Sequence, residues 1–274
     1  EICACLVGSE MCIRDRFKMG VAGAAIATIA SQIISAVLAT AKLMRSKEAY
    51  RITLKGIGLH RKLLGRMLHI GIPAGLQSSM YAISNMIIQV AVNLLGTATV
   101  AAWSLSGKID GFYWACSNAA GIAVMNFAAQ NYGAGRMDRV HDCEKLSLKL
   151  FMGVTLLFSA LLLGFGRFLL PLFNDDAEVL AKTWQVMLYM VPLYFTWTYI
   201  EIISGVLRGI GDAVVPVIII GVGVCLLRVV WIATVYRSHP NMLNVCLAYP
   251  ISWIVTDVAF FFYYRRVKWL YHIK

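Results

Sequence analysis

The chain has 274 residues, of which 59% are hydrophobic and only 14% are charged, and its formal net charge is +11. A soluble globular domain carries roughly 45–50% apolar and about 25% charged residues, so this composition excludes a single soluble core. The apolar residues lie in continuous blocks, each long enough to cross the roughly 30 Å of hydrocarbon in a bilayer. We therefore predict an all-α integral membrane protein, because barrel strands would alternate apolar and polar residues.

Seven blocks are predicted to be transmembrane helices. In chain order they are 19–41, 68–95, 100–130, 150–173, 184–207, 213–236 and 242–264. Basic segments follow the first, third and seventh blocks, and such segments stay on the cytoplasmic side. With seven crossings all three basic segments lie on the cytoplasmic side, whereas six or eight crossings would not place them all there. We expect a protein of the cell (inner, cytoplasmic) membrane with a cytoplasmic C-terminus, whose positive charge serves topology and lipid contact rather than nucleic-acid binding.

The seven cysteines form neither a CxxC pair nor a Cys/His cluster, so the sequence predicts no metal site and no disulfide framework. It also has no recognisable arrangement of nucleophile and base, which disfavours a membrane-embedded enzyme. No cofactor is expected.

The first sixteen residues do not resemble the start of a protein. They begin without Met, and residues 5–16 resemble the translated adapter sequence left on untrimmed reads. We expect residues 1–16 to be a non-native leader and the reading frame to begin inside a longer gene.

Motifs in several predicted helices resemble the C-terminal half of a multidrug and toxic compound extrusion (MATE) transporter. They are HIGIPAGLQ at 69–77, GKID at 107–110, QNYGAG at 130–135, SGVLRGIGD at 204–212 and YPISW at 249–253. The first block, with GVAGAAIAT at 20–28, resembles the last helix of the N-terminal lobe. The resemblance extends from about residue 19 to the end of the chain.

The resemblance implies a twelve-helix antiporter with two six-helix lobes. A proton or sodium gradient would drive export of organic cations or other amphipathic small molecules by alternating access. The chain would comprise the last N-lobe helix (17–41), a basic cytoplasmic interlobe linker (42–66), the six-helix C-terminal lobe (67–264) and a cytoplasmic tail (265–274). Its partners would be the bilayer, the small-molecule substrate and the missing N-terminal lobe.

Polar side chains recur at every fourth residue of the second block. They are Gln77, Tyr81, Asn85 and Gln89, followed by Asn93. Such a stripe spirals slowly around one side of a helix and is expected to line a water-filled cavity. The alternative is hydrogen bonding between packed helices.

The third block carries two charges, Lys108 and Asp110, inside the predicted membrane region. Residues two apart on a helix do not face each other, so each requires a partner on a neighbouring helix. A structural charge network and an ion-coupling role are both open. Where this block ends, Asn131 and Gly133 are expected to terminate the helix, with a left-handed glycine, in an architectural role.

The fifth block gives the sharpest functional signal. Tyr194, Trp197, Glu201 and Arg208 fall on one predicted helical face. A carboxyl held away from water favours its neutral form, so Glu201 could exchange a proton against a cationic substrate. Tyr194 and Trp197 could hold that cation over their rings. The alternative is a structural Glu201–Arg208 ion pair.

Two further charges lie deep in the last two blocks. Asp257 is expected near the depth of Glu201, below a helix kink at Pro250. Arg228 requires an anionic partner, and the sequence leaves open whether this is Asp110, Asp257 or neither.

The coupling ion stays unassigned between H⁺ and Na⁺. Some branches of the family have an acidic residue in the helix that matches 68–95, where this chain has none, and others place their carboxylates in the N-terminal lobe. A related flippase for lipid-linked saccharides is the first alternative, disfavoured because few basic residues occur in the helices. A seven-helix receptor is the second alternative.

Overall fold

The computed structural model describes residues 20–45, 51, 58 and 60–270. The chain divides into two compact units, Glu1–Gly65 and Arg66–Lys274, and each is described by itself. In the first unit α2 (Gly20–Arg45) is a single helix whose last turn carries Lys42 and Arg45, where cations stabilise the negative end of the helix dipole. The predicted leader (1–16), about half of the predicted linker (46–50, 52–57 and 59) and the last residues of the tail (271–274) lie outside the described residues.

The remaining helices follow one another with short connections. They are α3 (Arg61–Asn93), α4 (Thr97–Gly133), α5 (Met137–Leu169), η2 (Leu170–Leu172), α6 (Ala177–Met190), η3 (Val191–Leu193), α7 (Tyr194–Gly209), α8 (Val214–Ile220), η4 (Gly221–Leu226), α9 (Leu227–Trp231), η5 (Ile232–Tyr236) and α10 (Met242–Leu270). The segments α6, η3 and α7 form one rod, and so do α8 to η5. All seven predicted blocks are therefore helical, and α10 continues through Pro250.

Five of these rods are long and apolar enough to cross a membrane: α2, α5 with η2, α6 to α7, α8 to η5, and α10. Helices α3 and α4 have 33 and 37 residues, more than the roughly 20 that a crossing requires, but their sequences are richer in polar side chains. The protein is thus a multi-pass helical membrane protein. The count of seven crossings stays a prediction for α3 and α4.

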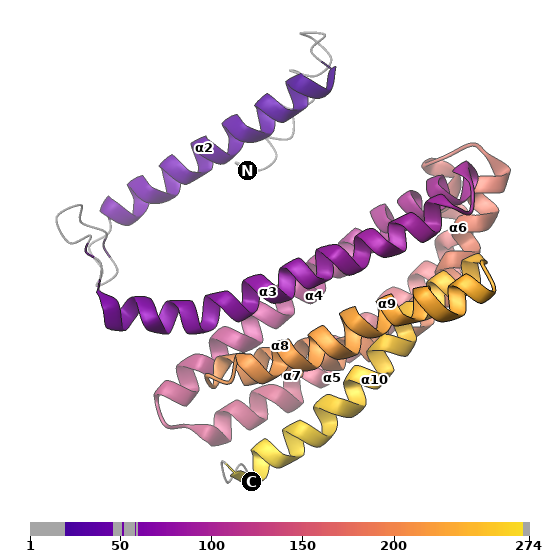
Figure 1. Ribbon diagram of the computed structural model, residues 1–274. Helices are drawn as coiled ribbons and strands as arrows, with labels where there is room; N and C mark the ends of the chain where they lie inside the picture. Colours follow the sequence, from indigo (N-terminus) through magenta and orange to yellow (C-terminus); the bar gives the residue numbers. More distant parts are fainter. Residues whose placement is uncertain (1–19, 46–50, 52–57, 59, 271–274) are drawn as a thin grey trace. The chain divides into compact units, whose positions relative to one another are not determined.

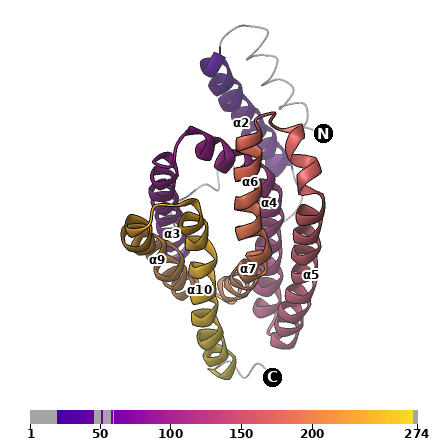
Figure 2. The same cartoon turned by 90° about the vertical axis from the view of Figure 1, so that its right-hand side faces the viewer.

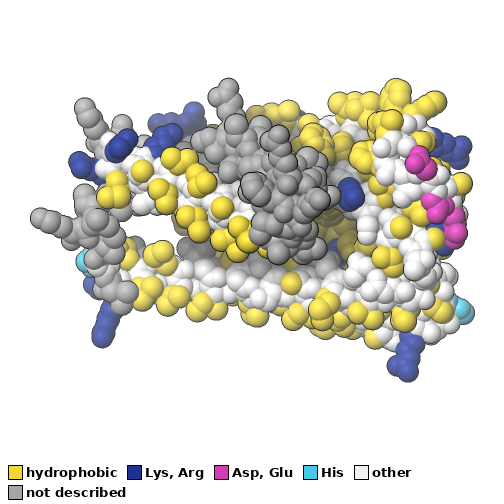
Figure 3. Space-filling model, turned by 90° about the horizontal axis from the view of Figure 1, so that it is seen from above, with side chains coloured by type: hydrophobic (Ala, Val, Ile, Leu, Met, Phe, Trp, Pro, Cys, Tyr) yellow, Lys and Arg dark blue, Asp and Glu magenta, His cyan; other side chains and the backbone are white. Residues whose placement is uncertain are grey.

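Within the second unit the rods run back and forth along a common direction, roughly from left to right in Figure 1. The α3–α4, α5–α6 and η5–α10 connections lie at one end, and the α4–α5 and α7–α8 connections lie at the other with the end of α10. The acidic segment 174–178 belongs to the first end, where Figure 3 shows acidic side chains gathered. The basic segments 136–149 and 265–268 belong to the other end. Basic residues also occur at the first end (Arg167, Lys182 and Arg237), but they are more numerous at the second, which is the kind of bias that the positive-inside rule describes.

The main hydrophobic core is built by α4, α6, α7 and α10, with Tyr194, Ile203, Trp253 and Phe260 among its fully buried side chains. Figure 2 shows α5 on one side of the bundle and α3 and α9 on the other, with α4 and α7 between them. A smaller cluster joins the C-terminal part of α3 to η5 and α10. There the Tyr236 hydroxyl donates a hydrogen bond of 2.7 Å to the Ala91 carbonyl.

Helices α5 and α6 begin earlier than the hydropathy predicted, at Met137 rather than 150 and at Ala177 rather than 184. Charged and polar residues fill these extra turns, which can project beyond the hydrocarbon region. Asp176 caps α6, because its carboxylate accepts hydrogen bonds from the backbone N–H groups of Glu178 (2.8 Å) and Val179 (3.4 Å).

Helix α4 ends at the predicted place, but the left-handed residue is Gly135 (φ 72°) and not Gly133. The Arg136 N–H donates to the Asn131 carbonyl at 2.9 Å, which is the closing bond of a Schellman turn. Gly133 still belongs to the last helical turn, two residues before the reversal. The Asn131 side chain donates to the Phe127 carbonyl of its own helix at 2.9 Å. This bond keeps the Asn131 amide within its own helix.

Helices α4 and α7 approach each other through glycines. A Cβ added at Gly209 would lie 2.6 Å from the Met125 carbonyl oxygen and 2.7 Å from the Ala128 Cβ. A Cβ at Gly205 would lie 3.0 Å from the Gly121 carbonyl oxygen. Small residues at such crossings let membrane helices pack closely by van der Waals contact.

We expect Gly209→Ala to destabilise the protein by about 1–3 kcal/mol, because the new methyl group would force the two backbones apart. The matched control is Gly164→Ala in α5, where a Cβ meets nothing within 4 Å. The control should be neutral or slightly stabilising, since alanine favours helix over glycine. Unfolding in a denaturing-detergent titration measures both. Equal stabilities of the two variants would contradict the close packing of α4 on α7.

Candidate functional site

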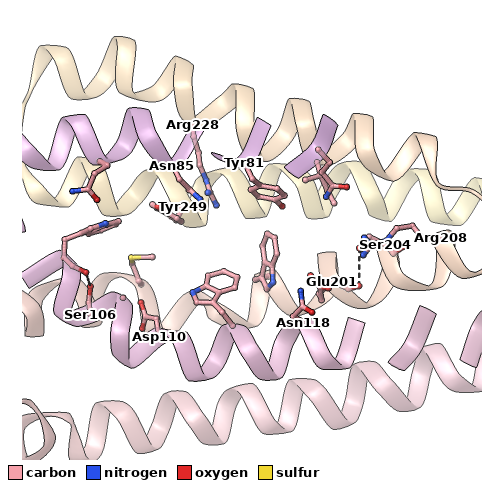
Figure 4. Close-up of a pocket in the computed structure, with 18 residues that line it drawn as sticks. Tyr81, Asn85, Ser106, Asp110, Asn118, Glu201, Ser204, Arg208, Arg228 and Tyr249 are labelled. Atoms are coloured by element: carbon pink, nitrogen blue, oxygen red, sulfur yellow. Dashed lines mark hydrogen bonds between the residues drawn. The ribbon is translucent and has the colours of Figure 1, made fainter. Parts of the chain in front are cut away.

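A cavity of about 600 Å³ lies inside the second unit, between α3 on one side and α4 and α7 on the other (Figure 4). Its wall consists of Gln77, Tyr81, Asn85, Gln89, Trp103, Ser106, Gly107, Asp110, Trp114, Asn118, Met190, Trp197, Glu201, Ser204, Arg208, Ile220, Arg228 and Tyr249. The wall combines aromatic rings, uncharged polar groups, two carboxyls and two guanidinium groups. Nine of the residues singled out by the sequence are among them.

The polar stripe of α3 faces this cavity. Gln77, Tyr81, Asn85 and Gln89 all line it, as the cavity interpretation predicts. The hydrogen bond between Gln89 Nε2 and Asn93 Oδ1 (2.9 Å) joins neighbours on the same helix and does not connect α3 to another helix. The stripe is thus available to a ligand or to water.

Aromatic rings form a continuous band along the cavity. The ring centroids of Trp114 and Trp197 are 5.2 Å apart in an edge-to-face arrangement, and Tyr81 lies 6.4 Å from Trp197 across the cavity from α3. The Trp197 indole N–H donates to Ser117 Oγ at 3.1 Å, which fixes the ring. Sequence reasoning missed Trp103 and Trp114. The sequence did hold a signal for them. Both tryptophans lie at helical spacing from Ser106, Gly107 and Asp110, which places all five residues on one face of α4.

Asp110 lies in the cavity wall with only 6% of its surface exposed. Its neighbour Tyr194 is not part of that wall, so a cation in this cavity would not meet the Tyr194 ring directly. Tyr194 is fully buried and stacks on Tyr113 at 4.5 Å and 13°. Asp110 and the Tyr194 hydroxyl are buried next to each other. Lys108 is exposed and lies outside the cavity wall, on a different face from Asp110 as expected.

Glu201 projects from α7 into the cavity and lies over Gly121 of α4. A Cβ placed on Gly121 would overlap the Glu201 carboxyl group. Arg208, one helical turn beyond Ser204, donates hydrogen bonds of 3.2 Å to the Ser204 carbonyl and to Ser204 Oγ (Figure 4). The Glu201–Arg208 ion pair, which was the alternative to a functional role, is not formed between these two described side chains, and the Glu201 carboxyl faces the cavity.

We expect Gly121→Ala to displace the Glu201 carboxyl without removing it, because the added methyl group would occupy its position. If this carboxyl acts at a defined position, the variant should lose export activity by about tenfold while keeping its fold. Gly107→Ala is the matched control, since Gly107 also lines the cavity but a Cβ there meets nothing within 4 Å. Dye efflux and gel filtration measure the two effects. Full activity of Gly121→Ala would show that the placement of Glu201 does not matter.

The sequence left open whether Asp110 or Asp257 is the partner of Arg228. In the structure Arg228 forms an ion pair with neither of them. It is 3% exposed and its Nε donates to Ser252 Oγ at 3.1 Å. Its guanidinium carbon lies 4.0 Å from the centroid of the Tyr249 ring and 5.9 Å from that of Trp253, which is cation–π geometry. The cavity therefore contains two guanidinium groups, those of Arg208 and Arg228, against two carboxyls. This is more basic than the helix sequences suggested.

Asp257 lies away from the cavity. It lines a separate, mostly apolar pocket with Tyr199, Val258, Phe261 and Phe262. Sequence reasoning placed Asp257 near Glu201 by depth alone. However, Tyr199 stands two residues before Glu201 on α7 and so faces a different side of that helix. The two carboxyls therefore belong to different pockets.

A buried polar cluster outside the cavity was also missed by sequence reasoning. Glu144 of α5 is 6% exposed, and its Oε2 accepts hydrogen bonds from the Tyr264 hydroxyl (2.9 Å) and contacts His141 Nδ1 (2.8 Å). Tyr263 donates a hydrogen bond to Asp212. The i, i+3 spacing of His141 and Glu144 was the available signal. These contacts join α5 and the α7–α8 connection to the end of α10.

Long apolar helices around a cavity lined by polar, charged and aromatic side chains are the arrangement of a membrane transporter. Comparison with known proteins identifies the family of transporters. The family model MatE matches residues 73–234, and the chain belongs to this family, the MATE transporters. Members of the family are transporters and not enzymes.

Two curated relatives come from Bacillus subtilis (strain 168). The probable multidrug resistance protein YoeA is 24% identical over 254 residues, covering 91% of this chain and 55% of the relative. The probable multidrug resistance protein YpnP is 26% identical over 253 residues, covering 92% of this chain and 56% of the relative. The chain thus spans about half the length of the curated relatives that it matches.

A solved structure has the same fold. The crystal structure of MATE in complex with MaL6 superimposes with a TM-score of 0.85 at 17% identity, covering 96% of this chain and 60% of the other. At this level of identity the likeness concerns the fold alone.

Proposed function

We propose that the chain forms the C-terminal lobe of an exporter for organic cations or other amphipathic small molecules, and that the cavity is part of its substrate path. The observation that carries this proposal is the cavity wall itself. The rings of Trp114 and Trp197, 5.2 Å apart, offer faces for a delocalised cation, and Asp110 and Glu201 supply negative charge nearby. The names of the two Bacillus relatives, both probable multidrug resistance proteins, support the same class of function.

A proton or sodium gradient would energise the export. Asp110 and Glu201 are carboxyls in membrane helices, where ionisable groups are costly and mark substrate or ion pathways. Neither is held in an ion pair with another described side chain. Each could therefore bind a proton or a sodium ion and release it when a cationic substrate arrives. Alternating access would then couple the entry of the ion to the export of the substrate.

The orientation follows from the distribution of charge. Basic residues of 136–149 and 265–268 lie at one end of the second unit, and the acidic connection 174–178 lies at the other. The basic end would face the cytoplasm of the cell membrane, with the C-terminus on that side. The N-terminal lobe of the same protein would supply the other half of the path.

Reconstitution of the transporter that contains this chain and both lobes tests the proposal. Vesicles are equilibrated with a rhodamine methyl ester, a permanent aromatic cation, at the same concentration inside and outside, and an inward proton or sodium gradient is imposed. We expect one of the two gradients to drive the dye out against its own concentration difference. Dye movement that ignores both gradients would contradict a gradient-coupled exporter and favour a channel or a receptor.

A further inference from the structure

The Arg228 guanidinium is the most deeply buried charge in the cavity wall, at 3% exposure. Burying a charge away from water is unfavourable unless an opposite charge and hydrogen bonds compensate it. Here the described side chains supply one hydrogen bond, from Nε to Ser252, and the face of the Tyr249 ring. No carboxylate among the described residues lies within ion-pair distance of it.

Arg228 lines the cavity, and no described side chain accepts a hydrogen bond from its terminal nitrogens. Figure 4 shows Arg228 on one wall beside Asn85 and Tyr249, whereas Asp110 and Glu201 lie on the opposite wall. Among the described residues, the wall that holds Arg228 has no carboxyl, whereas the opposite wall holds both carboxyls together with Arg208. Ligands that match this cavity carry both charges.

The backbone around Arg228 is built to hold this position. The short helix α9 (Leu227–Trp231) lies between two π-helical segments, η4 and η5, and such irregular turns occur frequently at functional sites. Within η4, Gly223 packs so closely on α10 that a Cβ would overlap Thr256 Oγ1. This contact brings Arg228 next to Ser252 and Tyr249 of α10.

We propose that Arg228 binds the carboxylate of the transported molecule, so that the preferred substrates are aromatic zwitterions rather than simple cations. This inference rests on the proposed function and names the substrate class of the same cavity. A carboxylate would accept charge-assisted hydrogen bonds from the terminal guanidinium nitrogens, the strongest pairing available to arginine. The cationic part of the substrate would lie among the rings on the side of Asp110 and Glu201.

Two dyes with the same ring system separate the possibilities. A rhodamine with a free carboxylate is a zwitterion, and its methyl ester is a cation of nearly equal size. Fluorescence polarisation on the purified two-lobe transporter gives a Kd for each. We expect the unchanged protein to bind the free acid more tightly than the ester. Arg228→Gln should weaken binding of the acid by about tenfold or more and leave that of the ester within about twofold.

Arg167→Gln is the matched control. Arg167 also lies over an indole ring, that of Trp184 at 5.3 Å, but it is exposed and outside the cavity. It should change neither Kd. Arg228→Lys keeps the charge and should retain part of the preference for the acid. The comparison of the two dyes on the unchanged protein does not depend on whether any variant folds.

Equal or tighter binding of the ester by the unchanged protein would overturn the inference and leave the export proposal standing. Equal losses for both dyes in Arg228→Gln would also overturn it, because the arginine would then be structural. If neither dye binds, the inference and the proposed function both fail.

Discussion

Glu201→Gln in the two-lobe transporter should reduce gradient-driven export of the rhodamine ester to the level of membranes without the protein. Glutamine keeps the size and much of the hydrogen-bonding capacity of glutamate, but it cannot bind and release a proton or pair with a sodium ion. The Glu201 carboxyl faces the cavity over Gly121 and is not paired with Arg208, so the site itself should survive the change. The expected loss is in coupled transport rather than in dye affinity.

Efflux in cells and Kd by fluorescence polarisation separate these two quantities. The matched control is Glu178→Gln, whose carboxylate pairs with Lys182 at 2.8 Å at the start of α6 and is 66% exposed. Exposed pairs of this kind contribute little, so the control should export normally. Unchanged efflux by Glu201→Gln, with its ion dependence intact, would reduce Glu201 to a structural residue.

Trp253→Ala should be the most destabilising single substitution in the neighbourhood of the cavity. Trp253 is fully buried and its ring lies 5.9–6.2 Å from those of Trp114, Tyr194, Trp197 and Tyr249. Removing such a side chain from a packed core destabilises a protein by about 3–5 kcal/mol, because a void replaces it. The void lies directly behind the cavity wall, so dye affinity should fall with stability.

Phe168→Ala provides the comparison, since Phe168 is 78% exposed on α5 and leaves no void when truncated. We expect its effect on unfolding in the denaturing-detergent titration to stay within about 0.5 kcal/mol. Trp253→Phe should fall between the two, as it keeps a ring in the cluster. Similar stabilities of Trp253→Ala and Phe168→Ala would mean that the aromatic band does not organise the core.

The periodicity of polar residues was sufficient to predict the α3 stripe. A helix with Gln77, Tyr81, Asn85 and Gln89 on one side has to place that side against a polar space, and one regular helix fixes all four positions. The same reasoning grouped Tyr194 with Trp197 and Glu201, but Tyr194 does not line the cavity. Residues on one face of a helix are not all equally accessible. The Tyr194 ring is covered by the rings of Tyr113 and Trp114 from α4 and of Trp253 from α10.

For an isolated charged residue, the sequence indicates how deep in the membrane it lies but not the direction in which its side chain points. Asp257 and Glu201 were expected together because their helices place them at similar depths, but they face different pockets. The surroundings of Arg228 were equally out of reach. Its contacts with Ser252 and Tyr249 depend on how η4 packs against α10, and no local pattern in either segment encodes that distance.

Photolabelling tests most directly whether this cavity is the binding site for small molecules. A rhodamine ester carrying a diazirine group is photolysed on the purified two-lobe transporter, and labelled peptides are identified by mass spectrometry. We predict labels on the cavity-facing residues of α3, α4 and α7, among them Tyr81, Trp114 and Trp197, that excess unlabelled ester abolishes. Competable labelling confined to other surfaces, such as the pocket of Asp257 and Phe262, would contradict the account.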